Sequence, residues 1–415
     1  MKLDLRRRQV GSAVAPREPA GRARLALILG GLTAFGPLSL DMYLPGLPSL
    51  ARDLGASAAQ AQLTLTACLL GVACGQLMVG SLSDSLGRRL PLLLGLVTYA
   101  VCSLLCAVTV SAPELIAARF LQGAAGGAGI VIARAVARDL YSGVALARFF
   151  GVLMLVNGSA PVLAPVIGGQ LLRVGSWRTS FFALALIGGF LLVAAGLGLP
   201  ETLPRERRRS GGLAPTLATY RRLLGDRQFV GYALCCGLAI GALFTYIAGS
   251  PFVLEGIYGL SPQGFSLVFA TNAIGIVSAG QVSARLVARV GARRLLAAGL
   301  ISAFVGGLAL LVAVLAGAGL YGILPALFVV VSSGGLVMPN AIALALADQG
   351  AVAGSASALL GLCQFVIGAL AAPLAGIAGP TTAVPMALVI STLTTGALIC
   401  FVTMLRGRPA PGSRS

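Results

Sequence analysis

Twelve long apolar runs, separated by short polar connections, constrain this chain more than any other feature of its sequence. Charged residues make up only 10% of the 415 residues, whereas hydrophobic residues make up 57%. A soluble domain carries about 25% charged residues, so this chain cannot cover its surface with charge, and lipid must be its main solvent. Each run has the length of about 20 residues that crosses a bilayer as a helix.

Only helices and closed barrels satisfy every backbone polar group inside a bilayer, and these runs are too long and continuous for barrel strands. The sequence therefore predicts an all-α integral membrane protein with twelve transmembrane helices in two pseudo-symmetric six-helix bundles. The predicted spans are 25–46, 60–81, 90–110, 113–133, 148–171, 179–199, 229–252, 264–286, 294–315, 319–342, 353–376 and 383–404.

The distribution of arginine predicts the orientation. If the N-terminal tail lies inside, 26 of the 30 Lys and Arg residues fall in tails or connections on that side. Cytoplasmic loops carry such an excess, so we expect a multi-pass membrane protein with both termini in the cytoplasm. The expected organisation is a basic tail (1–24), a first bundle (25–199), a flexible cytoplasmic linker rich in Arg, Pro and Gly (200–228), a second bundle (229–405) and a second tail (406–415).

The two halves resemble each other at a constant offset of 204 residues. Before the second and eighth spans, Gly55 and Ser57 correspond to Gly259 and Ser261. In the turns that follow these spans, Gly87 corresponds to Gly291. Ser57 and Ser261 are predicted helix N-caps. Together with the central linker and the charge pattern, these matches indicate a duplicated bundle.

Ionisable residues deep in a membrane are costly and mark functional sites, and only two lie well inside a span. Asp41, in the first span, is interpreted as a carboxylate that faces a central cavity and takes up and releases a proton; the alternative is a solvated residue at the membrane boundary. Arg119, in the fourth span, is interpreted as a fixed positive charge that tunes a nearby carboxylate or exchanges partners with it. Its alternative role is a structural bond to backbone carbonyls.

Two further segments are candidates for moving parts. The turn after the second span holds Gly80, Asp84, Gly87, Arg88 and Arg89, which we interpret as a cytoplasmic gate, with a pure topology signal as the alternative. The fifth span holds Pro161, Pro165, Gly168 and Gly169. Proline interrupts helix hydrogen bonds, so this span is predicted to hinge or, equally, to be thinned for close packing.

Several classes of chemistry are excluded or disfavoured. The chain has no histidine, which removes Ser-His-Asp catalysis and histidine metal sites. The eight cysteines all lie inside apolar runs without a metal-binding spacing. The net charge of +18 lies between the apolar runs rather than in a stripe beside aromatic residues, so nucleic-acid binding is not expected. We expect no enzyme activity, no metal and no cofactor.

The turn from Gly80 to Arg89 resembles the G-x-L-x-D-x-x-G-R-R signature of the major facilitator superfamily. Arg119-x-x-Gln122-Gly123 resembles its fourth-span signature, and Ala164-Pro165-x-x-Gly168-Gly169 the antiporter motif of the fifth, with Ala164 in place of the usual glycine. The closest similarity is to the drug:proton antiporters with twelve spans of the Bcr/CflA (bicyclomycin and chloramphenicol resistance) subfamily. It is carried by 40–48, 246–252 and 354–361.

The resemblance implies a substrate cavity between the halves at mid-membrane and a transport cycle of alternating access. We expect the cavity to be lined by polar residues of the spans, namely Tyr43, Gln122, Asn157, Tyr246, Asn272, Asn340 and Gln364. In the second half, Ala288 and Ile323 stand where Asp84 and Arg119 would align, so proton chemistry should be concentrated in the first half.

The resemblance further implies efflux of small drug-like molecules across the bacterial inner membrane in exchange for protons, by a monomer driven by the proton gradient. The alternative is a proton-coupled transporter of a metabolite such as an amino acid or a sugar.

Overall fold

The computed structural model describes residues 19–141, 143–204, 206, 208, 213–349, 352–379 and 381–405. Within these residues the chain consists of helices and connections without strands, and twelve helices are long and apolar enough to cross a membrane. This confirms the predicted fold class and the predicted number of spans. The C-terminal tail 406–415 and the N-terminal tail up to residue 18 lie outside the described residues.

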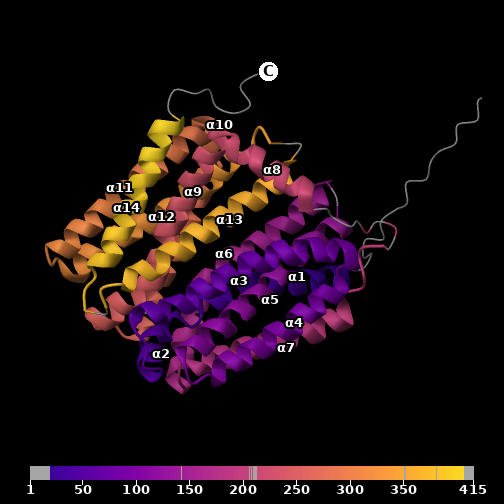
Figure 1. The fold of residues 1–415 in the computed structure, drawn as a ribbon, viewed down its shortest axis with the longest axis horizontal. Coiled ribbons are helices and arrows are strands. Elements are labelled where there is room, and N and C mark those ends of the chain that lie inside the picture. Colours follow the sequence, from indigo (N-terminus) through magenta and orange to yellow (C-terminus); the bar gives the residue numbers. More distant parts are fainter. Residues whose placement is uncertain are drawn as a thin grey trace, which may run out of the picture.

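The N-terminal half comprises residues 19–204. Its elements are α1 (Pro19–Asp41), η1 (Leu44–Gly46), α2 (Leu47–Asp53), α3 (Ala58–Leu86), α4 (Arg89–Val108), α5 (Ala112–Leu140), α6 (Gly143–Val174) and α7 (Arg178–Gly198). In Figure 1 these elements, drawn from indigo to magenta, lie together on one side of the molecule.

The C-terminal half comprises residues 227–405. Its elements are α9 (Arg227–Pro251), η3 (Phe252–Ile257), α10 (Pro262–Val290), α11 (Ala292–Leu315), α12 (Gly319–Leu346), α13 (Ala353–Ala371), η5 (Ala372–Gly376), α14 (Val384–Cys400) and η6 (Phe401–Leu405). They occupy the other side of the molecule in Figure 1.

Close helix packing in the first half depends on glycine. Helix α3 packs along α5, and Gly71, Gly75, Gly123 and Gly127 lie at their contact. A Cβ atom at any of these four positions would overlap the backbone of the opposite helix. Membrane helices lack a hydrophobic driving force between them and associate through small residues that allow such approach. This packing gives a physical reason for part of the high glycine content of the chain.

The backbone repeats between the halves at the predicted offset. Gly55 and Gly259 have φ angles of +58° and +69°, and Gly87 and Gly291 have φ angles of +98° and +88°. The side chain of Ser57 accepts a hydrogen bond from the N–H of Gln60, and that of Ser261 from the N–H of Gly264, each over 3.1 Å. Both N-caps were predicted from the sequence. Equivalent turns therefore join equivalent helices in the two halves.

The two halves are joined toward one end of the bundle. We call this end, which carries α2, the α2 end, and the opposite end, where α7 ends and α9 begins, the linker end. One apolar core runs through the N-terminal half and continues into the C-terminal half at residues such as Phe252, Phe265 and Met386, which lie toward the α2 end. A second core, around Phe229 and Leu296, is confined to the linker end of the C-terminal half. Apolar packing between the halves is thus concentrated at the α2 end.

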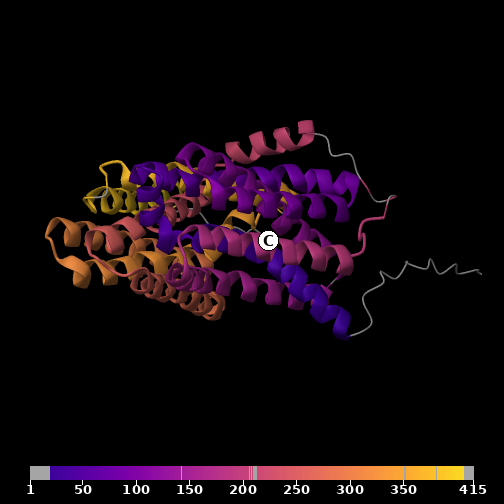
Figure 2. The ribbon, with the colours of Figure 1, turned by 90° about the horizontal axis from the view of Figure 1, so that it is seen from below.

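The connection between the halves contains a helix. Within the predicted linker 200–228, residues Leu213–Gly225 form helix α8, and the predicted flexibility of the segment stays a prediction. Its only proline, Pro215, lies in the first turn, where a missing N–H costs nothing, and the helix ends at a glycine. Helix α8 packs against α9 and α13, and Figure 2 shows it lying at the edge of the bundle.

Candidate functional site

Asp41 is the last residue of α1 and is buried, with 5% of its surface exposed. Its carboxyl group forms no ion pair with any described residue, because the three ion pairs of the described chain involve Asp84, Asp139 and Glu201. No hydrogen bond to this carboxyl group occurs among the described residues either. A buried carboxylate without partners is costly when charged, so Asp41 is a group whose environment favours a bound proton.

Arg119 on α5 is fully buried inside the N-terminal half. One guanidinium nitrogen, Nη1, donates to Gln122 Oε1 over 2.6 Å, and Nη2 donates to the carbonyl oxygen of Ser39 over 2.7 Å. The guanidinium also lies over the rings of Tyr43 and Phe181, at 4.4 and 5.4 Å from their centroids. The charge is therefore balanced by a carbonyl, an amide and two aromatic faces, not by a carboxylate.

The structure does not bring Asp41 and Arg119 into an ion pair. Arg119 is bonded to the backbone carbonyl of Ser39, two residues before Asp41. Asp41 interacts electrostatically with Tyr246 of the C-terminal half. The predicted exchange of partners between Asp41 and Arg119 stays a prediction.

Two of the predicted cavity residues belong to the surroundings of Arg119. The hydroxyl group of Tyr43 shares a hydrogen bond of 3.0 Å with that of Thr64, and Gln122 Nε2 donates to Ser103 Oγ over 2.7 Å. Tyr43 and Gln122 are both fully buried within the first half. In this conformation both side chains contact Arg119, and their predicted contact with substrate stays a prediction.

The other five predicted cavity residues are spread along the molecule. Asn272 Nδ2 donates to the hydroxyl oxygen of Tyr246 over 2.8 Å. Asn340 Nδ2 donates to Ser283 Oγ, and Gln364 Nε2 to Cys236 Sγ. Asn157 is partly exposed on α6. These hydrogen bonds join Tyr246 to Asn272 and give Asn340 and Gln364 other partners, and the predicted contact of all these residues with substrate stays a prediction.

The turn between α3 and α4 is held by charged groups of the first half. Arg88 Nη1 donates to Asp84 Oδ1 over 2.5 Å, and Arg88 Nε donates to Asp139 Oδ2 over 3.0 Å. Burial by itself would lower the pKa of the Arg88 guanidinium, but these two carboxylates raise it above its usual range. Gly87 has a φ angle of +98°, which favours glycine at the turn.

Glu201, directly after α7, completes this cluster. Its carboxylate accepts hydrogen bonds from the backbone N–H groups of Arg88 and Arg89, over 2.8 and 3.2 Å, at the start of α4. Burial would raise the pKa of Glu201, but these bonds, a third from Leu203 and the charge of Arg208 lower it. These contacts all lie within residues 80–208, at the linker end. The predicted gate role of the turn stays a prediction.

The proline segment of α6 lies where the halves meet. Helix α6 continues through Pro161 and Pro165 without a break. The carbonyl oxygen of Pro165 accepts a hydrogen bond from Ser266 Oγ, and that of Gly169 accepts one from Gln263 Nε2, each over 2.8 Å. A Cβ atom at Gly168 would overlap the carbonyl of Met42. The segment thus combines the close packing that the sequence suggested with contacts to the other half, and its predicted hinge motion stays a prediction.

The sequence profile of the Major Facilitator Superfamily matches residues 29–373 of this chain. The chain belongs to the Major Facilitator Superfamily. Its sequence is 42% identical to the uncharacterized MFS-type transporter YdgK of Bacillus subtilis (strain 168), over 92% of this chain and 96% of that protein. It is also 34% identical to a bicyclomycin resistance protein homolog of Haemophilus influenzae, over 67% of this chain and 70% of that one.

Further similarities agree with this assignment. A chloramphenicol resistance protein of Pseudomonas aeruginosa is 34% identical, over 67% of this chain and 65% of that protein. Among solved structures, a single-residue mutant of the nucleoside transporter NupG matches with a TM-score of 0.76, 12% identity and coverage of 93% and 100%. The D-xylose-proton symporter matches with a TM-score of 0.70, 18% identity and coverage of 94% and 98%. These structural likenesses concern the fold of the superfamily.

Sequence reasoning missed the residues that join the halves of this superfamily member. Besides the two bonds to α6, Gln62 Nε2 donates to the carbonyl oxygen of Ala248 over 3.3 Å, and Thr66 Oγ1 to that of Ala369 over 3.2 Å. Among the described residues, these are the four hydrogen bonds that connect the halves. We call them the interhalf bonds, and all four lie toward the α2 end.

One of the missed contacts had a signal in the sequence. Pro373 has no N–H group, so the carbonyl of Ala369, four residues earlier, has no helical partner. A donor from elsewhere is then required, and Thr66 supplies it. Asp139 and Glu201 had a weaker signal, as acidic residues close to basic turns.

Proposed function

We propose that this chain exports small drug-like molecules in exchange for protons, by alternating access. The observation that carries this proposal is Asp41: a buried carboxyl group without hydrogen bond or ion pair among the described residues, at the end of α1. Such a group holds a proton when buried and releases it when solvated. The similarity to proteins named for bicyclomycin and chloramphenicol resistance supports the substrate class.

The orientation follows from the charge asymmetry of the sequence. We propose that the linker end faces the cytoplasm of a bacterium and that the chain lies in the inner membrane as a monomer. The linker end then holds Arg88, Arg89 and the arginines of the connection between the halves, as the positive-inside rule requires. In this proposed orientation the interhalf bonds lie on the outer side and hold it closed.

The cycle links proton entry to substrate exit. In the outward-open state a proton binds Asp41, and the loss of charge allows this residue to be buried when the outer side closes. In the inward-open state, a cationic or polar substrate favours the charged carboxylate, and the proton leaves to the cytoplasm. Arg119 stays within the first half and supplies a fixed positive charge near the path. The proton gradient supplies the energy, and no cofactor is required.

The experiment is transport by purified protein in liposomes with an imposed pH gradient. We expect wild-type protein to move an antibiotic such as chloramphenicol against its gradient, and Asp41→Asn to lose this accumulation while retaining exchange of substrate down its gradient. Asp348→Asn, which neutralises an exposed acid just after the end of α12, is the matched control and should transport normally. Equal accumulation by wild type with and without the pH gradient would refute proton coupling.

A parallel screen addresses the substrate class. Expression in a pump-deficient bacterium should raise resistance to some members of an antibiotic panel and leave sugar and amino-acid uptake unchanged. A change in metabolite uptake without any change in resistance would replace the proposed substrate class with a metabolite.

A further inference from the structure

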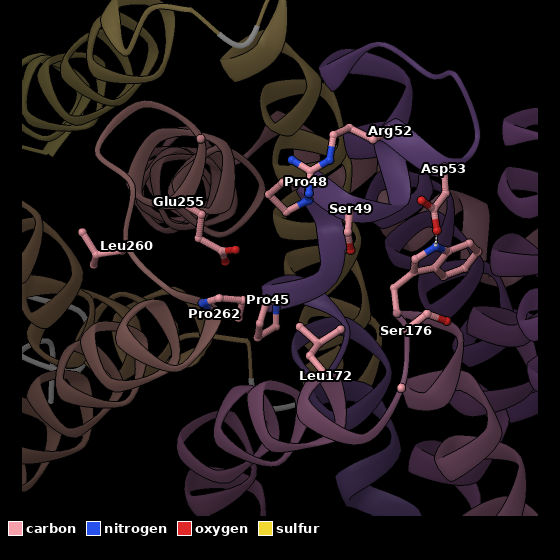
Figure 3. Close-up of a pocket in the computed structure, with 13 residues that line it drawn as sticks. Pro45, Pro48, Ser49, Arg52, Asp53, Leu172, Ser176, Glu255, Leu260 and Pro262 are labelled. Atoms are coloured by element: carbon pink, nitrogen blue, oxygen red, sulfur yellow. Dashed lines mark hydrogen bonds between the residues drawn. The ribbon is translucent and has the colours of Figure 1, made fainter.

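A cavity of about 530 Å³ lies between the halves at the α2 end. Figure 3 shows walls from both halves, among them Pro45, Arg52 and Asp53 of the N-terminal half and Glu255 of the C-terminal half. Pro45 lies four positions after Asp41 in the chain, so the cavity adjoins the segment that follows the buried carboxyl group.

The two acidic residues of this cavity differ in their partners. Asp53 Oδ2 accepts a hydrogen bond of 2.9 Å from Nε1 of Trp177, a residue that is fully buried. Glu255 has no such partner: its Oε1 atom is buried and forms no hydrogen bond. In Figure 3 its carboxyl group points into the cavity from η3, toward the elements of the other half.

Among the described residues, Arg52 is the only cation that lines the cavity, and it lies on α2, across the boundary between the halves. It is exposed to solvent and is not within 4.0 Å of the Glu255 carboxylate, since the three ion pairs of the described chain involve other residues. The positive charge of Arg52 therefore interacts with the Glu255 carboxyl group electrostatically, without a direct contact. Of the elements packed against η3, only α2 brings charged groups to this cavity, namely Arg52 and Asp53.

We propose that Glu255 is a second proton-binding residue, on the outer side, and that its protonation is required for the outer side to close. This inference rests on the proposed proton-driven function and assigns to it a residue beyond Asp41. A charged carboxylate that loses its water without gaining a hydrogen bond is destabilised. Closure buries one oxygen of Glu255 in this way, so the closed state selects the neutral form and the open state accepts the charged form.

The consequence is a coupling that depends on the outer pH. An acidic outer solution protonates Glu255 and favours closure, which carries the protein from its outward-open to its inward-open state with protons bound. An alkaline outer solution leaves Glu255 charged and keeps the outer side open. Proton entry therefore drives the step in which the empty exporter returns from its outward-open to its inward-open state.

The test is hydrogen–deuterium exchange of the purified full-length protein in lipid nanodiscs without substrate, comparing wild type with Glu255→Gln. The reporters are segments 44–56 and 372–379, which lie at the α2 end and do not contain the substitution. Both proteins are compared at the same pH, so the intrinsic pH dependence of exchange cancels. Glu114→Gln, which neutralises an exposed acid at the start of α5, is the matched control.

At about pH 5.5 we expect similar exchange in wild type and Glu255→Gln. At about pH 8.5 we expect exchange about tenfold faster in wild type, which is the ratio expected if the open and closed states differ about tenfold in their affinity for the proton. Glu114→Gln should behave as wild type. If wild type and Glu255→Gln exchange equally at both pH values, the proposal is overturned.

Arg52→Gln provides a second, independent readout if Glu255→Gln is unstable, and segment 372–379 alone is then the reporter because segment 44–56 contains the substitution. Removing the cation destabilises the closed, charged form further, so exchange at about pH 8.5 should rise above that of wild type. An unchanged or slower rate would contradict the proposal. Because no substrate is used, a positive result here together with absent antibiotic export would reject the proposed substrate and leave the role of Glu255 intact.

Discussion

The interhalf bonds allow a quantitative test of what keeps the outer side closed. Thr66 Oγ1 and Ser266 Oγ donate to carbonyl oxygens of the opposite half, those of Ala369 and Pro165. Thr66→Val and Ser266→Ala remove these donors without adding charge or bulk. Each carbonyl acceptor stays in place, so the double variant should weaken the closed state and leave the separate halves intact.

The magnitude follows from the measured strength of hydrogen bonds between membrane helices, which averages about 0.6 kcal/mol in double-mutant cycles. The four interhalf bonds together then contribute about 2.4 kcal/mol to closure, and the double variant loses about 1.2 kcal/mol of this on the same basis. At room temperature this loss is about an eightfold rise in the ratio of outward-open to outward-closed protein. The carbonyl of Ala369 also loses its only donor among the described residues, since Pro373 offers none, which increases the loss. The hydroxyl group of Ser266 also donates to the carbonyl of Pro262 in its own helix over 2.7 Å, which reduces the contribution of its interhalf bond.

The assay is a distance measurement between nitroxide labels on cysteines introduced at Val174 and Tyr321. These positions lie at the α2 ends of α6 and α12 and are 81% and 96% exposed, so labels should not disturb packing. Cys74 and Cys363, the native cysteines that are not buried, are first replaced by serine. The double variant should show an increased population of molecules at the label-to-label distance of the outward-open state.

Thr271→Val together with Thr392→Val is the matched control. Both hydroxyl groups are on exposed faces and donate to carbonyls of their own helices, those of Leu267 and Leu388. This pair should leave the distance distribution unchanged. If the Thr66 and Ser266 variant matches wild type as closely as the control does, the interhalf bonds do not determine closure and apolar packing alone must do so.

Four further outcomes are expected from single changes, each measured by thermal unfolding of the detergent-solubilised protein. Gly87→Ala should destabilise by about 1 kcal/mol or more, because an L residue is strained at a φ of +98°. Arg119→Met should cost about 3 kcal/mol by leaving buried acceptors without donors, and Arg119→Lys should cost less. Trp177→Phe should cost about 1 kcal/mol through loss of the bond to Asp53. The hydrogen bonds to Glu201 lower the pKa of this residue from 4.5, so its stabilising contribution is complete above that pH and is lost as the pH falls through the lower value; Glu201→Gln should remove this acid-dependent loss.

The features that were predictable from sequence are those with a local physical cause. Membrane spans follow from the length of apolar runs, because lipid leaves no alternative to the helix. The N-caps at Ser57 and Ser261 follow from a side chain that reaches the backbone three residues later. The positive φ at Gly87 follows from a turn that only glycine adopts without strain. Each of these depends on a few neighbouring residues.

The candidate site was less predictable because its contacts join distant segments. The sequence places Tyr43 and Gln122 within predicted membrane spans, but it does not show which face of each helix they occupy. The structure places both around Arg119, inside one half. Glu255 was missed because it follows the seventh predicted span and so looks like a loop residue, whereas the chain continues there as η3 and turns the side chain into the outer cavity.

Proline explains why closure occurs where it does. A continuous transmembrane helix uses its own carbonyls, so it offers few acceptors to another half. Pro373 frees the carbonyl of Ala369, and at the end of α9 the N–H of Phe252 turns to the carbonyl of Gly249, which leaves that of Ala248 available. Thr66 and Gln62 of the N-terminal half bind these two carbonyls. Bonds of this kind add no buried charge and break singly, so an exporter can close firmly at one end and still reopen within its cycle.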